Sequence, residues 1–243
     1  MDKIKILAIV PARSGSKGFI NKNIATIHGK TLLQYAIEFA NSLDEVDDVY
    51  VSTDSELYEN IGIKSGAKSL GLRSSELSND NAKTVDVVID LLSMIQKSYD
   101  LVLLLQPTSP LRDKNEFRIM LNNLIKSDAD ACVSVNNLEE PHPFKLKSIS
   151  SEGYIQSFLP NTTSEVPRQV LPKCLALTGA IYLIKKEALI NYQTFLPKKT
   201  IPFKSDYPLV NIDNKLDFEF LKFLIDSKLF TKNLFNESIN SIQ

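Results

Sequence analysis

Cysteine and histidine are scarce in this sequence of 243 residues, and tryptophan is absent. The two cysteines, Cys132 and Cys174, form no Cys-x-x-Cys motif, and only His28 and His142 could assist them. With so few candidate ligands and no metal-binding spacing, the sequence argues against zinc sites and Cys-His catalysis. We expect two buried, structural thiols.

The sequence also lacks an excess of charge of one sign and any long apolar run. Lys and Arg number 28 and Asp and Glu 29, for a net charge of −1, so no basic field exists to hold a nucleic acid. The longest apolar runs, residues 4–10 and 101–105, are far shorter than the ~20 residues that cross a bilayer. Residues 1–3 show no secretory signal. We therefore expect a cytoplasmic protein without nucleic-acid or membrane partners.

Short apolar runs alternate with amphipathic helical patterns along most of the chain. With 43% hydrophobic and 23% charged residues, the composition is that of one soluble domain over residues 1–243. Because continuous apolar strands are buried on both faces, we predict an α/β fold with an open, mostly parallel sheet and helices on both faces. The predicted strands are residues 4–10, 49–52, 101–105, 131–135, 179–184 and 210–213, and the predicted helices are residues 32–40, 56–65, 85–95, 115–125 and 216–225.

Residues 138–172 interrupt this alternation. They contain Pro141 and Pro143, an alternating run at 144–147 and a Ser-Glu-Gly turn at 151–153, a pattern typical of a solvated hairpin. We interpret the segment as an inserted arm that serves oligomerisation or acts as a lid. Residues 231–243 are polar and rich in asparagine, and we expect a flexible tail there.

The segment directly after the first predicted strand has the composition of a phosphate-binding loop. It reads Pro-Ala-Arg-Ser-Gly-Ser-Lys-Gly over residues 11–18, followed by Asn-Lys-Asn over 21–23. Glycines allow the backbone to approach an anion, and Arg13, Lys17 and Lys22 can neutralise phosphate oxygens. The loop matches neither the P-loop nor the dinucleotide-binding fingerprint. It predicts a polyphosphate site, with a solvated basic loop as the alternative.

Polar residues follow two further predicted strands. Residues 106–112, Gln-Pro-Thr-Ser-Pro-Leu-Arg, place an amide and hydroxyls at a strand end, where ligands of open α/β sheets bind, although an ordinary turn would look the same. Asp213 is a candidate Mg²⁺ ligand, since this ion is held by one or two carboxylates plus phosphates. For Asp217 we favour a capping role in the last helix, and for Asp54 a cap and a site residue are equally compatible with the sequence.

Taken together and in order, five segments resemble the acylneuraminate cytidylyltransferases, the CMP-sialic acid synthetase family. The resemblance extends over residues 4–225, and each segment alone would be weak. The segments are Arg13 with Ser16-Lys17-Gly18 and Lys22-Asn23, then residues 72–80, then residues 106–112, then Arg168-Gln169 before Gly179-Ala180-Ile181-Tyr182, and finally Ile212-Asp213.

The resemblance implies a Rossmann-like nucleotidyltransferase fold and a defined reaction. Members transfer CMP from CTP to the anomeric hydroxyl of a nonulosonic, sialic-type acid and release pyrophosphate, with Mg²⁺ or Mn²⁺ as cofactor. They are homodimers, so residues 138–172 would be a dimerisation arm that reaches the partner's site.

The resemblance also implies a role for individual residues. Lys22 and Asp213 would be catalytic, and Asp213 would bind the metal. The nucleotide would be bound by Arg13, Ser16, Lys17, Asn23, Arg73 and Thr84. The sugar acid would be bound by Gln106, Thr108, Lys145, Arg168, Tyr182 and Phe195.

Three positions depart from the family pattern and leave the sugar open. Asn211 replaces the first acid of Asp-Ile-Asp, while Ala176 and Thr178 replace an arginine and an asparagine near the sugar. Legionaminate, pseudaminate or another sialic-acid analogue is therefore an alternative substrate, whereas the first loop argues against the eight-carbon sugar Kdo. A non-catalytic nucleotide-binding subunit and a glycosyltransferase that uses CMP-sugars are alternatives from other classes.

Overall fold

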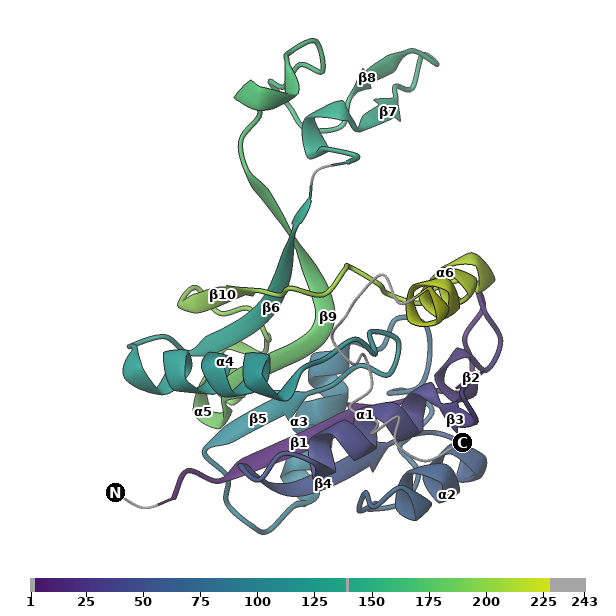
Figure 1. Cartoon of the computed structure of the whole chain (residues 1–243), viewed down its shortest axis with the longest axis vertical. Helices are drawn as coiled ribbons and strands as arrows, with labels where there is room; N and C mark the ends of the chain where they lie inside the picture. The colour runs from purple at the N-terminus through teal and green to yellow at the C-terminus, as the bar shows by residue number, and fades with distance from the viewer. Residues whose placement is uncertain (1–2, 139, 228–243) are drawn as a thin grey trace.

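A six-stranded sheet forms the centre of the computed structural model, which describes residues 3–138 and 140–227 (Figure 1). The strand order is β10-β6-β9-β5-β1-β4. These strands are β1 (Ile6–Pro11), β4 (Val46–Ser52), β5 (Leu101–Leu104), β6 (Ala131–Leu138), β9 (Cys174–Lys185) and β10 (Thr200–Lys204). The helices are α1 (Leu32–Asn41), α2 (Glu56–Lys64), α3 (Thr84–Met94), α4 (Lys114–Lys126), α5 (Lys186–Tyr192) and α6 (Lys215–Asp226).

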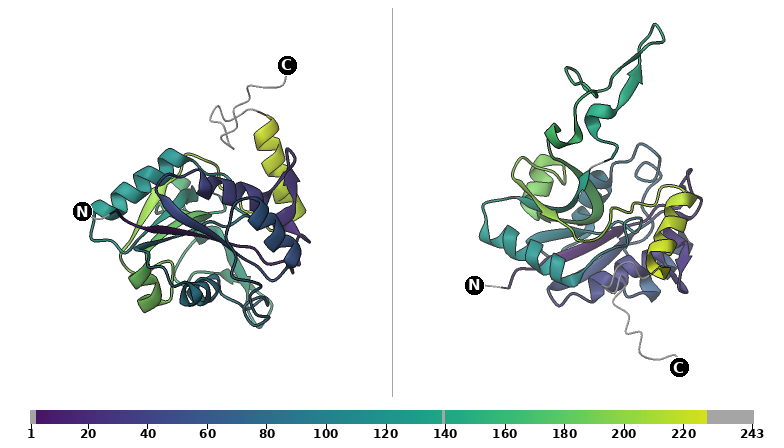
Figure 2. Two further views of the ribbon diagram at one scale, coloured as in Figure 1. Left: turned by 90° about the horizontal axis from the view of Figure 1, so that it is seen from below. Right: turned by 45° about the horizontal axis from the view of Figure 1, so that its top comes forward.

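Helices cover both faces of the sheet (Figure 2). Alternate residues of β1 enter two different cores, with Ile6 and Ala8 packed among α1, α2 and α4, and Leu7 and Ile9 packed with α3 and α5. This is the arrangement that continuous apolar strands require, because a strand between two helical layers buries side chains on each side. The predicted α/β class is confirmed. No helix within residues 3–138 and 140–227 is long and apolar enough to cross a membrane.

Strand direction in the sheet is mixed. β1 pairs in parallel with β4 and β5, and β10 pairs in parallel with β6, but β9 is antiparallel to both of its neighbours. The sequence identified part of β9 as a strand but could not give its direction, because an apolar run is the same in either orientation. The first residues of β9, which is twelve residues long, pair with the end of β6 and continue past the sheet as a two-stranded stem.

The prediction of a strand at residues 210–213 is wrong. This segment is extended but pairs with no strand, and its main attachment is the Ile212 amide, which donates to the Thr108 carbonyl at 2.8 Å. Ile212 and Val210 are buried in a third core with α6, which explains their apolar character without a strand. The edge position of the sheet belongs instead to β10, which the sequence analysis missed.

The predicted hairpin arm is present and projects from the body of the molecule (Figure 1). Strands β7 (Lys147–Ile149) and β8 (Ile155–Ser157) pair in antiparallel fashion, and the turn between them uses Gly153 at φ 86°. Short helices η2 (Pro143–Lys145) and η3 (Arg168–Val170) complete the arm. A small hairpin of β2 (Thr26–Ile27) and β3 (Lys30–Thr31) and the short helix η1 (Lys22–Ile24) precede α1. The predicted tail, residues 231–243, lies outside the described residues.

At the amino end of the parallel strands, Asp48 is buried and accepts three hydrogen bonds. The donors are the ammonium groups of Lys68 and Lys97 and the hydroxyl of Tyr99. Burial raises the pKa of Asp48, but the three hydrogen bonds outweigh it and hold the pKa well below its ordinary value of 3.8. The cluster therefore connects β4 to the segment after α2, which contains Lys68, and to the segment between α3 and β5, which contains Lys97 and Tyr99.

Replacing Asp48 with asparagine should lower the free energy of unfolding at pH 7 by about 1–3 kcal/mol, because a buried acceptor of charge-assisted hydrogen bonds is lost. A carboxyl whose pKa is depressed by folding stabilises the protein above its unfolded pKa and loses this effect as the pH falls. The difference between wild type and Asp48→Asn should therefore shrink below about pH 4. Urea titrations between pH 3 and 7 measure it.

The matched control is Asp128→Asn, which removes an exposed carboxylate from an ion pair with Lys199. Exposed pairs contribute little, so this variant should stay within about 0.5 kcal/mol of wild type. Equal effects of the two substitutions would contradict a stabilising role for the Asp48 cluster.

Candidate functional site

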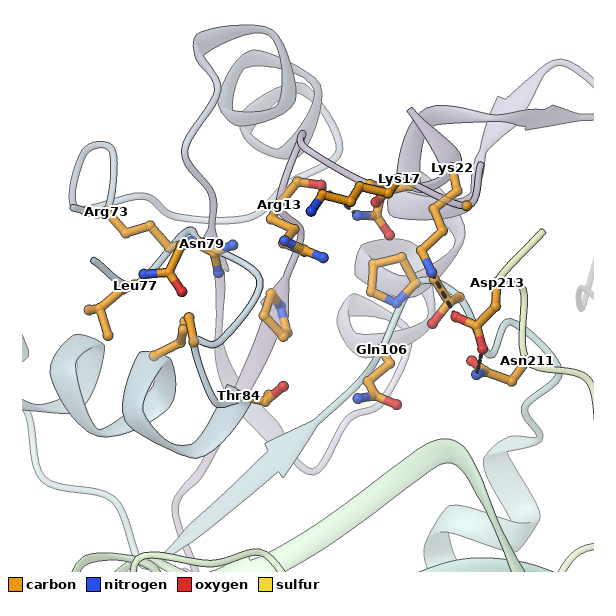
Figure 3. A pocket seen from close by; sticks show the side chains of 18 residues that line it. Arg13, Lys17, Lys22, Arg73, Leu77, Asn79, Thr84, Gln106, Asn211 and Asp213 are labelled. Carbon is orange, nitrogen blue, oxygen red and sulfur yellow. Dashed lines mark hydrogen bonds and ion pairs between the residues drawn. The ribbon is translucent and has the colours of Figure 1, made fainter. Parts of the chain in front are cut away.

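A cleft of about 540 Å³ lies at the carboxyl ends of β1 and β5 (Figure 3). Four segments form it: the loop after β1, the stretch before α3, the loop after β5, and residues 211–213. The predicted site residues that line the cleft are Arg13, Ser16, Lys17, Lys22, Asn23, Arg73, Thr84, Gln106, Thr108 and Asp213. Residues separated by up to 200 positions in the chain thus share one cavity.

Buried hydrogen bonds set the shape of the loop after β1. The Asp54 carboxylate accepts from the Ser14 amide at 2.8 Å and from the Ser14 hydroxyl at 3.0 Å. The Asn23 side chain donates to the Arg13 carbonyl at 2.9 Å. Asp54 does not cap α2, because Ser55 occupies the N-cap position. Its carboxylate instead supports the loop after β1 through Ser14.

The cations of this loop share one carboxylate. Arg13 Nη1 lies 2.7 Å from Asp80 Oδ1, and Lys17 Nζ lies within hydrogen-bond distance of Asp80 Oδ2. The hydrogen bonds from Lys17 and Arg13 lower the pKa of Asp80, so it is ionised at neutral pH. The sequence predicts no role for Asp80, because only the fold brings it beside the loop.

A second ion pair lies at the other end of the cleft (Figure 3). Lys22 Nζ donates to Asp213 Oδ1 at 2.8 Å, while Asn211 Nδ2 donates to Asp213 Oδ2 at 2.8 Å. A side chain at Gly18 would place its Cβ 2.6 Å from the Asp213 carbonyl oxygen. The glycine therefore allows the loop after β1 to approach the backbone that carries Asp213.

Asp213 is the residue best placed to hold a cation together with an anionic ligand. Its side chain is 67% exposed and opens to the cleft. Within residues 3–138 and 140–227, His, Cys, Asp and Glu form no group of three or more that could ligate a metal alone. A single exposed carboxylate beside the lysine and arginine side chains of the cleft nevertheless suits Mg²⁺, which keeps several waters and binds through one or two carboxylates plus phosphates. Asp217 caps α6, as favoured from the sequence.

The opposite end of the cleft is less charged. Arg73 is half-buried, its amide donates to the Thr53 carbonyl at 2.9 Å, and its Nε donates to the Ser78 hydroxyl at 3.2 Å. Burial lowers the pKa of Arg73, and the nearby Asp54 opposes this effect. The lining residues that the sequence analysis did not predict include Leu77, Asn79, Ala82 and Val87.

Four predicted sugar-binding residues do not line this cleft. Tyr182 packs edge-on against Phe195 with ring centroids 5.9 Å apart, in the core with α3 and α5, and burial raises the pKa of Tyr182. Lys145 and Arg168 belong to the arm, where Lys145 pairs with Glu140 at 2.8 Å. Their proposed roles therefore depend on whether an arm reaches a cleft from another subunit.

The two cysteines differ in environment. Cys132 is buried and its pKa is raised to about 11 by burial, as expected for a structural thiol. Cys174 is only half-buried, contrary to expectation, and its Sγ lies 3.3 Å from His142 Nε2. His142 Nδ1 accepts from the Phe144 amide at 3.2 Å, and Nε2 lies 2.9 Å from the Pro172 carbonyl oxygen. Both ring nitrogens therefore already have backbone partners.

Replacing Asp80 with asparagine should strengthen the binding of inorganic tripolyphosphate about two- to fivefold at low salt, since Arg13 and Lys17 no longer share their charge with a carboxylate. Calorimetric titration at 50 mM and 300 mM NaCl measures the affinity, and the gain should diminish at high salt. Asp128→Asn, which removes an equal charge far from the cleft, should leave the affinity unchanged. Weaker binding by Asp80→Asn would mean that the carboxylate organises the cations instead of competing for them.

The chain is similar in sequence and structure to proteins that use cytidine nucleotides. An N-acylneuraminate cytidylyltransferase of Streptococcus agalactiae is 33% identical over 219 residues, which are 88% of this chain and 52% of that protein. A CMP-N,N'-diacetyllegionaminic acid synthase of Legionella pneumophila is 31% identical over 228 residues, 92% of this chain and 97% of that protein. This chain thus spans about half the length of the streptococcal relative and nearly all of the other.

The fold agrees with these similarities. The solved structure of a CMP:2-keto-3-deoxy-manno-octonic acid synthetase complexed with CTP matches with a TM-score of 0.69 at 20% identity, covering 93% of this chain and all of that one. A family model described as cytidylyltransferase matches residues 7–224, a range that contains every segment of the cleft. The chain therefore belongs to the cytidylyltransferase family.

Proposed function

We propose that this protein transfers CMP from CTP to the anomeric hydroxyl of a nonulosonic, sialic-type acid and releases pyrophosphate. The observation that carries the proposal is the distribution of charge in the cleft: the cations of one loop lie beside the Lys22–Asp213 pair, and Gln106 lies between that pair and the less charged end (Figure 3). A nucleoside triphosphate needs a cationic surface for its phosphates and a less charged surface for its nucleoside. Because CTP is a cytoplasmic nucleotide, we place the reaction in the cytoplasm.

In this proposal the residues of the cleft bind different parts of the nucleotide. Arg13 and Lys17 leave Asp80 and bind the triphosphate, together with Ser16 and the backbone near Gly18. Arg73, Thr84 and Asn23 bind the cytidine. The hydroxyl oxygen of the sugar acid attacks the α-phosphorus, and its proton passes to solvent. The bond from the α-phosphorus to the pyrophosphate oxygen breaks and pyrophosphate leaves, while Lys22 neutralises charge on the α-phosphoryl oxygens. The side chains serve positioning and charge neutralisation, which supply most of the rate in phosphoryl-type transfer.

The residues around Asp213 suit Mg²⁺ or Mn²⁺ as a cofactor. Such an ion, when bound, neutralises phosphate oxygens and lowers the pKa of a hydroxyl that it ligates. Asp213 would be its protein ligand, with substrate phosphates completing the coordination. Asn211 contributes an amide in place of a second carboxylate, so the protein supplies one negative charge where two would bind the ion more strongly.

Positions 176 and 178, which depart from the family pattern, supply no charged contact to the sugar acid. Thr178 is buried and its hydroxyl contacts the Ser134 hydroxyl, so it supports the strand and is not a sugar contact. Ala176 pairs with Asn136 in the stem and supplies no cation. We therefore propose neutral polar contacts to the sugar substituents. Legionaminate-type and pseudaminate-type acids stay alternatives to N-acetylneuraminate, in keeping with the names of the relatives.

We also propose that the arm, residues 138–172, forms a homodimer and brings Lys145 and Arg168 to the partner's sugar site. The support is the exposure of large apolar side chains on a projecting hairpin, since such surface usually marks an interface. These side chains are Ile149, Tyr154, Ile155, Phe158 and Val170.

Pyrophosphate release from CTP and Mg²⁺ tests the reaction. We expect a signal with one acid from a panel of N-acetylneuraminate, legionaminate, pseudaminate and Kdo, and little with UTP, ATP or GTP. Asp213→Ala should lower kcat by about 100-fold or more, the usual loss when an electrostatic contact to the reacting phosphoryl group is removed. Asp226→Asn, which removes an exposed carboxylate from the end of α6, should keep its activity. CTP binding without turnover of any acid would favour a non-catalytic subunit.

Ile155→Asp tests the dimer. Ile155 is 77% exposed and pairs with Ile149 across the hairpin, so a charge there should break an interface without disturbing the core. Light scattering at about 10–100 µM should give a dimer for wild type and a monomer for the variant. Leu57→Asp, at an exposed apolar residue of α2, should stay dimeric. A monomeric wild type would refute the proposed interface.

A further inference from the structure

Arg112 is a buried cation that the proposed mechanism does not use. It is 4% exposed, and its Nη1 has no hydrogen-bond partner among the described residues. Its Nε donates to the Ala180 carbonyl at 2.8 Å, its Nη2 donates to the Gln106 carbonyl, and the Phe39 ring lies 5.9 Å from its Cζ. The guanidinium therefore interacts with two backbone carbonyls and an aromatic ring. Burying a charged guanidinium without a carboxylate partner raises the free energy of the folded state. The contacts that Arg112 makes therefore need an explanation.

The carbonyls of Gln106 and Ala180 belong to two different structural elements. Gln106 begins the loop after β5, and Ala180 lies on β9 where its pairing with β6 shifts register between Val133 and Val135. The same loop touches β9 at Gly179, where a Cβ would lie 2.4 Å from the Ser109 hydroxyl and 2.7 Å from Gln106 Oε1. Arg112 thus fastens the loop to the strand at the point where the Gln106 side chain is aimed.

The irregular part of β9 is itself held rigidly. The buried Ser134 hydroxyl contacts the Thr178 hydroxyl and accepts from the Ile181 amide at 3.0 Å, and the Ala180 amide donates to the Thr178 hydroxyl at 3.2 Å. The Ala180 carbonyl that Arg112 binds is therefore held in one position. Through Arg112 it also restrains the position of the loop after β5.

From the loop, contacts continue to Asp213. The Thr108 carbonyl accepts from the Ile212 amide at 2.8 Å, and the Ser109 hydroxyl donates to Asn211 Oδ1 at 3.2 Å. The Asn211 amide is thereby oriented so that its Nδ2 meets Asp213. The phosphate-binding cations are held separately, by Asp54 beneath Ser14 and by Asp80.

We propose that Arg112 is a positioning residue for the sugar and metal side of the cleft: by binding the Gln106 and Ala180 carbonyls it fixes the loop that presents Gln106 and Thr108 and supports Asn211 and Asp213. The expected change in KM for the sugar acid rests on the proposed function, whereas the expected change in amide hydrogen exchange does not. Arg112 does not touch substrate in this role.

Arg112→Lys tests the proposal, because lysine keeps the charge but cannot reach two carbonyls with a planar fork. We expect KM for the sugar acid to rise at least tenfold while the dissociation constant for CTP, measured without sugar, changes less than threefold. Amide hydrogen exchange should accelerate at least tenfold in a peptide covering residues 209–215, although the hydrogen bonds of Arg112 go to Gln106 and Ala180. The control is Tyr99→Phe, which removes a buried hydrogen bond from the Asp48 cluster at the other end of the sheet and should show neither effect.

Equal changes in the sugar KM and CTP affinity, or exchange at residues 209–215 no faster than in Tyr99→Phe, would overturn the proposal. If Arg112→Lys does not fold, Phe39→Leu serves instead, since it removes the ring beside the guanidinium and should give a smaller change in the same direction. The absence of that change would likewise overturn the proposal. If wild type turns over no sugar acid, the proposed function fails, and the exchange comparison alone decides the role of Arg112.

Discussion

The parallel pairing of β1 with β5 is the constraint on which the rest of the structure depends. Ile6 to Ile9 stand beside Leu101 to Leu104 in register, so both strands end at the same edge of the sheet. The loops that follow, beginning at Pro11 and Gln106, therefore meet, although almost 100 residues separate them. Each strand is buried between two helical layers, and the apolar contacts on both faces hold the two loops in a fixed relation.

The positive charge of the cleft is partly neutralised within the protein itself. Arg13 and Lys17 pair with Asp80, and Lys22 pairs with Asp213. Each pair is partly exposed, so water and salt weaken it and an incoming polyphosphate can replace it at small cost. Carboxylates in these positions also limit the repulsion between neighbouring cations. The arrangement keeps the cations ordered and still available.

The antiparallel strand β9 connects the sheet to the arm. Because it runs against its neighbours, its first residues leave the sheet beside the end of β6 and carry the arm outward (Figure 1). Its irregular stretch near Gly179 lies against the loop after β5. One strand thus supports the arm at its first residues and contacts the loop after β5 near its middle, so the proposed sugar-binding residues of the arm and of the loop are connected through a single element.

The sequence by itself determined the α/β class, most helices and the polar segments of the cleft. These features are local: an apolar run, a helical period and a loop rich in glycine and cations each depend on residues near one another in the chain. It did not determine the direction of β9, the unpaired course of residues 210–213, or the partners of Asp54, Asp80 and Arg112. Those depend on which segments pack together, since a carboxylate that caps a helix and one that supports a loop have the same local sequence. Tertiary packing alone decided between them.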